Sequence, residues 1–135
     1  IDDMLEDALA RRLPLAGGGS LLFEPCETLT AIDVNAGGLA MAGGAERVAI
    51  ATNLAAAAQI ARQVRLINLS GALVIDFLGL RARGRQRELV DRLRRAFAAD
   101  PARPWIGNLS PIGLVEMSRR HMGPSLYDRF GQRPD

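Results

Sequence analysis

Two aspartates lie inside segments that otherwise have the pattern of β-strands. Asp33 is near the end of TLTAIDVN at 28–35, and Asp76 lies within ALVIDFL at 72–78. A carboxylate among valine, isoleucine and phenylalanine is costly to bury as an ion unless a cation or a hydrogen-bond donor compensates it. Two converging carboxylates, with room for water and a phosphate, are a common way to hold Mg²⁺. The alternative is that Asp33 begins a turn and Asp76 binds a backbone group, and the spacing alone leaves both interpretations open.

The two aspartates would come together if residues 28–34 and 72–78 form neighbouring parallel strands. A helix expected over 46–69 would connect them as a crossover, and the carboxyl ends of both strands would then lie at the same edge of the sheet. Asn35 follows Asp33 by two residues and shares its face if the strand continues, so its amide is placed to orient the carboxylate.

The wider pattern predicts an α/β (α+β) fold with a mixed β-sheet, a βαβ crossover and packed helices. The almost continuous apolar run at 72–78 is typical of a strand buried on both faces. We expect an N-terminal helix over 2–12 within the segment 1–16, broken by Pro14 and the glycines that follow, and a loosely held tail over 127–135. The other elements are expected at 20–24 (strand), 81–99 (a basic segment leading into a helix), 105–108 (strand) and 113–118 (strand).

All seventeen basic residues are arginine, whose planar guanidinium suits phosphate. A genome rich in G and C would produce the same bias. Seven arginines follow Asp76 closely, where a phosphodiester enzyme would hold the backbone of its substrate. The alternative for those on the helix is a solvated face with ion pairs at a spacing of four residues, Glu88 with Arg92 and Asp91 with Arg95. In the segment before the helix we favour phosphate binding, through Arg81, Arg83, Arg85 and Arg87.

Composition limits the class of protein. With 135 residues and 48% hydrophobic content, the chain suits a single domain over 1–135 with its own core, and a mainly disordered protein is excluded. No apolar run is long enough for a membrane-spanning helix, and we expect no signal peptide. The missing initiator Met indicates a piece of a longer protein. A single cysteine, Cys26, excludes an internal disulfide and any multi-cysteine zinc site, which points to a reducing, cytoplasmic setting.

Several segments together resemble the central catalytic region of the bacterial ribonuclease E/G family: LTAIDVN, ATNLAAAAQIARQVRLINLSG, LVIDF, RLR and GLVEMSR. The likeness covers about residues 17–126 without large gaps. It implies a DNase I-like subdomain in which Asp33 and Asp76 bind the catalytic Mg²⁺, or Mn²⁺, and Asn35 supports them. It also implies that Arg119, within GLVEMSR, is one of the basic residues that bind RNA.

Other features of the family are altered in this chain. The loop AGGLAMAGG at 36–44 lacks the arginines that usually precede its Gly-Gly, and Gly79 stands where the family has an acidic residue. Ser-Pro-Ile-Gly at 110–113 replaces a Ser-Arg-Phe-Gly motif, and His121 replaces a second arginine. The family's Cys-Pro-x-Cys zinc link is absent, so we expect neither zinc nor a zinc-linked tetramer, while another homo-oligomer stays open.

The resemblance therefore implies a Mg²⁺-dependent endoribonuclease domain that hydrolyses phosphodiester bonds of single-stranded RNA, leaving 5′-phosphate and 3′-hydroxyl ends. The alternative is a catalytically weakened RNA-binding or regulatory module derived from the same family. The lost loop arginines favour the alternative, whereas the intact set of Asp33, Asn35 and Asp76 favours the enzyme. Metal-dependent cleavage distinguishes the two.

Overall fold

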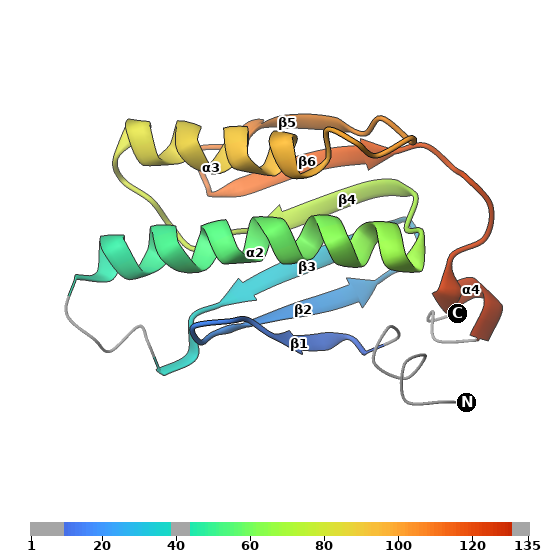
Figure 1. Ribbon diagram of the computed structural model, residues 1–135, viewed down its shortest axis with the longest axis horizontal. Coiled ribbons are helices and arrows are strands. Elements are labelled where there is room, and N and C mark those ends of the chain that lie inside the picture. The colour runs from blue at the N-terminus through green and yellow to red at the C-terminus, as the bar shows by residue number, and fades with distance from the viewer. Residues whose placement is uncertain (1–9, 39–43, 131–135) are drawn as a thin grey trace.

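The computed structural model describes residues 10–38 and 44–130 of the chain. In chain order its elements are β1 Arg12–Pro14, β2 Ser20–Pro25, β3 Leu29–Asn35, α2 Ala45–Ile67, β4 Gly71–Asp76, α3 Arg83–Ala96, β5 Trp105–Leu109, β6 Leu114–Arg119 and α4 Leu126–Phe130. The strands form one sheet in the order β1-β2-β3-β4-β6-β5 (Figure 1). Only β3 and β4 pair in parallel, and the other neighbours are antiparallel. The mixed α/β fold expected from the sequence is confirmed.

Helix α2 is the crossover that makes the parallel pair possible. It returns from the carboxyl end of β3 along the sheet to the start of β4, so both strands point the same way (Figure 1). Its alanines favour helix and let it lie close to the sheet. The helix ends at Asn68, a left-handed residue with φ of 58° whose N–H bonds back to the carbonyl oxygens of Val64 and Arg65.

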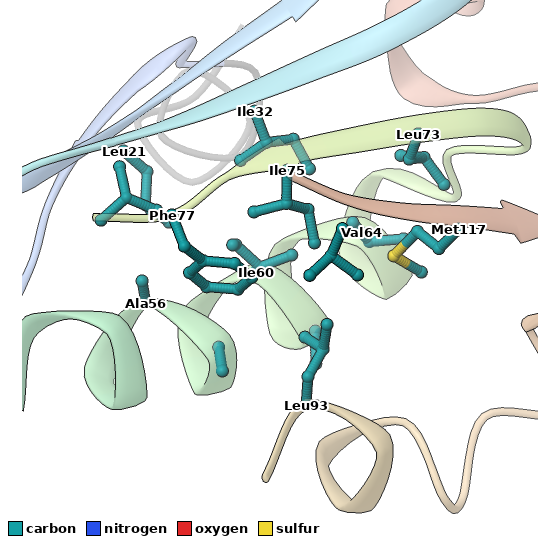
Figure 2. Packing of buried hydrophobic residues seen from close by; sticks show 14 of the residues in the cluster. Leu21, Ile32, Ala56, Ile60, Val64, Leu73, Ile75, Phe77, Leu93 and Met117 are labelled. Atoms are coloured by element: carbon teal, nitrogen blue, oxygen red, sulfur yellow. The ribbon is translucent and has the colours of Figure 1, made fainter. Parts of the chain in front are cut away.

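The core lies between the sheet and the helices α2 and α3 (Figure 2). Ile60 and Val64 of α2 and Leu93 of α3 are fully buried, as is Ile75 of β4, and Met117 of β6 is nearly so. Each buried side chain of this size contributes roughly 1.5–3 kcal/mol relative to its exposed state. This layer fixes the two central strands against α2.

The two helices cover one face of the sheet (Figure 1), and the side chains of β4 alternate between this covered face and the opposite one. Leu73 and Ile75 are buried beneath the helices, whereas Ala72 and Asp76 are exposed on the other face, called the open face below. The prediction that this strand is buried on both faces is therefore wrong. The apolar run led to this wrong prediction because it continues past the end of the strand into the loop. There Phe77 packs into the core although it is not part of the strand.

Both ends of the chain also differ from prediction. The helix expected over 2–12 falls mostly on residues 1–9, outside the described residues, but its expected end is wrong because Arg12–Pro14 pairs with β2 as a strand at the sheet edge. The tail expected to be loose begins with helix α4, in which Tyr127 is fully buried; residues 131–135 lie outside the described residues. Within the described ranges, no helix has both the length and the apolar character needed to cross a membrane.

Candidate functional site

The two predicted aspartates lie side by side at the carboxyl edge of the parallel strands. Asp33 of β3 and Asp76 of β4 are register partners, and neighbouring strands are about 4.8 Å apart. Both residues are exposed on the open face of the sheet. The parallel pairing predicted from the sequence is thereby confirmed, and it leaves two carboxylates facing solvent as neighbours.

The closeness of the two carboxylates affects the pKa of Asp33. Its pKa is raised above the usual aspartate value, first by partial burial and then by the negative charges of Asp76 and Glu24, while Arg12 acts in the opposite direction. A neighbouring like charge disfavours the ionised carboxylate. A cation between the two side chains would relieve this repulsion, so the pair is suited to bind one.

Asn35 lies on the same face as Asp33, two residues further along β3. Its side-chain oxygen accepts a 2.7 Å hydrogen bond from the N–H of Gly37, where a positive φ of 59° turns the chain away from the sheet. The amide of Asn35, expected to orient the Asp33 carboxylate, makes no hydrogen bond to it among the described residues. Asn35 instead fixes the turn at which β3 ends.

The segment after β4 is fastened to α2 by a buried asparagine. Asn53 is fully buried; its Nδ2 donates to the carbonyl oxygen of Leu78 at 2.8 Å, and its Oδ1 accepts from the N–H of Leu78 at 2.9 Å. The two bonds satisfy polar groups that would be costly to bury unpaired. Because Leu78 follows Asp76 by two residues, Asn53 determines how the chain leaves the site.

A second fastening comes from Glu46 in the first turn of α2. Its carboxylate accepts hydrogen bonds from the backbone N–H groups of Arg81 at 3.0 Å and Ala82 at 3.1 Å. These bonds, that from Ala82 above all, lower the pKa of Glu46. Ala82 is the N-cap of α3 and makes no side-chain cap bond, so the carboxylate of Glu46 takes over part of the capping at this helix end.

The four arginines predicted to bind phosphate gather at the same end of the sheet. Arg81, Arg83 and Arg87 are exposed and Arg85 is half-buried, on the loop after β4 and the first turns of α3. Cations at a helix N-terminus act against the helix dipole. A bound anion would relieve the repulsion between these arginines and the positive end of α3. Helix N-termini are in general favourable places for anions.

Two open hollows flank residues 79–81 at this edge. One, of about 510 Å³, is bordered by the start of α2; the other, of about 420 Å³, is bordered by the turn at 110–113. That turn reaches the site because Leu114 is the register partner of Asp76. The carboxylates, the arginines and both hollows thus lie at one end of the molecule.

The arginines further along α3 behave differently. Arg94 donates from Nη2 to the carbonyl oxygen of Ile106 at 3.1 Å and to Asn108 at 3.0 Å, which ties α3 to β5. Neither of the two ion pairs predicted along the helix is among the salt bridges of the described residues. This part of the basic segment is therefore partly structural.

Arg119 is not part of the edge that holds the aspartates. It is buried at the other end of β4, where its guanidinium donates to both carboxylate oxygens of Asp100, at 2.8 and 3.1 Å, to Asn68 at 2.9 Å and to the carbonyl oxygen of Leu69 at 2.8 Å. Burial acts to raise the pKa of Asp100, but the bonds from Arg119 and from the N–H of Ala102 outweigh it and the pKa is lowered. The prediction that Arg119 binds RNA is corrected, because its donors are used inside the protein.

The donor set at the edge fits a small hard cation. Within residues 10–38 and 44–130, no cluster of three His, Cys, Asp or Glu side chains could hold a metal ion, so the protein offers two carboxylates here. Mg²⁺ usually keeps several waters and is bound by one or two carboxylates together with substrate phosphates. Oxygen donors of this kind suit Mg²⁺ or Mn²⁺.

Two of the residues that position the site were missed from the sequence. For Asn53 a signal was present, because it lies at helical spacing from the buried Ala56, Ala57 and Ile60 of α2, where a polar side chain needs a partner. Glu46 offered no such signal, since its partners are backbone amides of a loop distant in sequence.

Comparison with known proteins adds the family. The model of the "Ribonuclease E/G family" matches residues 1–122. Ribonuclease E of Nostoc sp. is 40% identical over 131 residues, 97% of this chain and 19% of that protein. Ribonuclease E of Synechocystis sp. is 38% identical over 132 residues, 98% of this chain and 20% of that protein, and ribonuclease E of Escherichia coli is 44% identical over 126 residues, 93% and 12%. The chain spans a fifth or less of the length of these relatives, and it belongs to the ribonuclease E/G family.

Proposed function

We propose that this domain hydrolyses phosphodiester bonds of single-stranded RNA with a Mg²⁺ ion held by Asp33 and Asp76. The observation that carries the proposal is the register pairing of these two carboxylates at the carboxyl edge of adjacent parallel strands. The raised pKa of Asp33 supports it, because burial and then the repulsion from Asp76 disfavour the free carboxylate, and a bound cation would relieve the repulsion. The relatives named ribonuclease E support RNA as the substrate.

The chain's own residues divide the work between binding and positioning. A bound Mg²⁺ would supply the positive charge that activates a water molecule and neutralises the phosphate. Asp33 and Asp76 provide its protein oxygens, and Asn35 fixes the turn that follows them. Asn53 and Glu46 hold the segment after β4 by its backbone, so the edge is arranged before the substrate arrives.

The arginines of the neighbouring segment would bind the RNA backbone. Arg81, Arg83 and Arg87 are exposed, and Arg81 lines the hollow at the start of α2. Guanidinium groups bind phosphate through paired hydrogen bonds and make RNA affinity fall with salt. Their place at the N-terminus of α3 puts them at the edge that holds the aspartates.

A second function is favoured by what surrounds the pair. The loop 36–44 has no arginine, and the position after the VIDF segment is Leu78-Gly79 without a carboxylate. With fewer groups to hold a phosphate, the domain would bind RNA and cleave it slowly, as a regulatory module of the same family.

A cytoplasmic setting and a homo-oligomer without a zinc link stay predictions from the sequence.

Chelation of the metal tests the proposal. Single-stranded RNA labelled at its 3′ end is incubated with the protein and Mg²⁺, with EDTA, and with EDTA followed by excess Mg²⁺ or Mn²⁺. We expect cleavage only where free metal is present, and products that carry a 5′-phosphate. Salt-sensitive binding without cleavage under every metal condition would reject the enzyme and leave the binding module.

Asn53→Ala should loosen the edge without touching a metal ligand. The N–H and carbonyl groups of Leu78 would lose their buried partner, at a cost of roughly 1–3 kcal/mol for each unpaired group. Urea unfolding measures this loss of stability. The affinity of the site at Asp33 and Asp76 for Mn²⁺ is measured by water-proton relaxation. Asn68→Gly is the matched control, since it also removes a hydrogen-bonded asparagine, at the other end of α2, and glycine accepts its φ of 58°. Only Asn53→Ala is expected to weaken Mn²⁺ binding; an equal loss in both variants would mean that stability alone is involved.

A further inference from the structure

The chain's single tryptophan is open to solvent at the far end of the sheet from the aspartates. Trp105 is 61% exposed and begins the edge strand β5, opposite Ser118 of β6. Its ring lies against Gly107, since a Cβ at that glycine would come within 3.0 Å of a ring carbon. The backbone of β5 therefore supports the ring on one side, and its remaining surface is available for a partner.

A hollow of about 470 Å³ adjoins Trp105, between the end of α3 and the start of β5. Arg94 and Arg103 are among the residues that line it. The acid in its lining, Asp100, is buried and already paired with Arg119 at 2.8 Å. The charge that this hollow presents to a ligand is therefore positive.

The turn before Trp105 includes one arginine and contacts a second. Arg103 has a φ of 48°, a left-handed conformation that is unfavourable for residues other than glycine. Asp100 fixes this turn by accepting from the N–H of Ala102 at its carboxylate and from the N–H of Arg103 at its carbonyl, both at 3.0 Å. Arg120 donates to the carbonyl oxygen of Pro101 at 3.1 Å, so a second exposed arginine lies against the same turn.

We propose that Trp105, Arg103 and Arg120 form a second contact for single-stranded RNA, in which a base stacks on the Trp105 ring and the flanking phosphates bind the two arginines. An exposed aromatic ring beside cations is the arrangement with which proteins bind single strands without reading their sequence. The chemistry favours RNA over an apolar protein partner because arginine lines the hollow and its acid is already neutralised. Glu116 lies two residues before Ser118 on the open face. Its negative charge repels phosphate and so limits the contact on the side toward the aspartates.

The contact deepens the proposed function, on which it rests, by adding a site away from the scissile bond. Ser118 is the register partner of both Trp105 and Ala72, so the ring lies at the amino end of β4 and two strands to the side of it. With a rise of about 3.3 Å per residue and about 4.8 Å between strands, its Cα is roughly 16 Å from that of Asp76. An RNA strand a few nucleotides long would reach both places.

Tryptophan fluorescence tests the proposal directly, because the 135-residue chain has one tryptophan. The chain is titrated with oligoadenylate and, as a polyanion without bases, with heparin, in buffer with EDTA so that the RNA stays intact. We expect oligoadenylate to quench Trp105 in a saturable and salt-dependent manner, while heparin binds with little quenching. Equal quenching by both polymers, or none by oligoadenylate, would overturn the stacking contact.

Two variants with matched controls measure the contribution of each group. Arg103→Gly removes the guanidinium and relieves the positive φ; we expect weaker binding and a slope of log affinity against log salt that is smaller by about 0.7, with Arg62→Ala on α2 as the charge-matched control. Trp105→Ala should weaken binding of fluorescein-labelled RNA at least about fivefold, with the exposed Leu66→Ala as control. Losses no larger than those of the controls would overturn the proposal.

Cleavage measured with Mg²⁺ on the same preparation separates this proposal from the proposed function. Cleavage without quenching of Trp105 would reject the second contact and leave the nuclease intact. Saturable quenching without cleavage would support the contact and reject the nuclease.

Discussion

Replacing either aspartate of the register pair by asparagine should nearly abolish RNA cleavage. Asp33→Asn and Asp76→Asn keep the size of the side chain but remove one of the two negative charges that the parallel strands bring together. Because a cation at this edge depends on both carboxylates, we expect the rate of cleavage to fall at least about 100-fold. The rate is measured in single turnover with protein in excess, so that the bond-breaking step is observed and not product release.

Two other acids on the open face provide matched controls for these variants. Glu24 and Glu116 are exposed and stand one row away, opposite Ala31 of β3 and Val74 of β4. Glu24→Gln and Glu116→Gln remove the same charge from the same face, and we expect them to retain most of the cleavage rate. Equal losses in the glutamate and aspartate variants would mean that the face acts only through its total charge, which would contradict a specific site at Asp33 and Asp76.

Arg119→Met should be among the most destabilising single substitutions in the domain. The buried guanidinium has four hydrogen bonds, two of them to Asp100. Removing it leaves the carboxylate of Asp100 buried without its cation, which costs about 3–5 kcal/mol, a large part of the roughly 5–15 kcal/mol that stabilises a typical domain. Urea unfolding followed by circular dichroism measures the loss. Arg92→Met, at an exposed position on α3, should change the stability by no more than about 0.5 kcal/mol.

The pH dependence of unfolding tests the pairing of Arg119 with Asp100 in a second way, through the direction in which stability changes with pH. In the native protein the pKa of Asp100 is lowered, so the stability from the ion pair is present above the ordinary aspartate pKa of the unfolded chain. It is lost as the pH falls through the lowered value. In Arg119→Met the arginine no longer lowers that pKa, while burial still acts to raise it, so the variant should lose less stability than the native protein as the pH falls. A variant that loses stability in acid as the native protein does would contradict the assigned pair.

Much of the sheet and the central helix could be predicted because their signals are local. The alternation in 28–35 and the spacing of apolar residues along α2 depend on neighbours in the sequence. The meeting of Asp33 and Asp76 followed from one topological rule, that a helical crossover returns the chain to a parallel strand. The apolar run at 72–78 was less informative, since an apolar loop residue such as Phe77 looks the same as one in a strand.

The rest could not be predicted because it depends on contacts between distant segments. Arg119 meets Asp100, Asn68 and Leu69 only once α2, α3 and β6 are packed, and nothing near GLVEMSR in the sequence distinguishes a buried arginine from one that binds RNA. Strand β1 is three residues long, which is too short for alternation to be recognised, and it exists because β2 offers it a partner.

The parallel pairing of β3 and β4 has a consequence for the order in which the chain folds. The pairs β2–β3 and β5–β6 join neighbours in the sequence, and hairpins of this kind form within microseconds. Pairing β3 with β4 closes a loop that contains the whole of α2, at a larger cost in loop closure, so we expect it to follow the hairpins. A partly folded chain that has both hairpins therefore still lacks the site, because Asp33 and Asp76 lie on the two strands that meet late. The paired carboxylates belong only to the completed fold, so a folding intermediate of this domain would have no functional edge to bind metal or RNA.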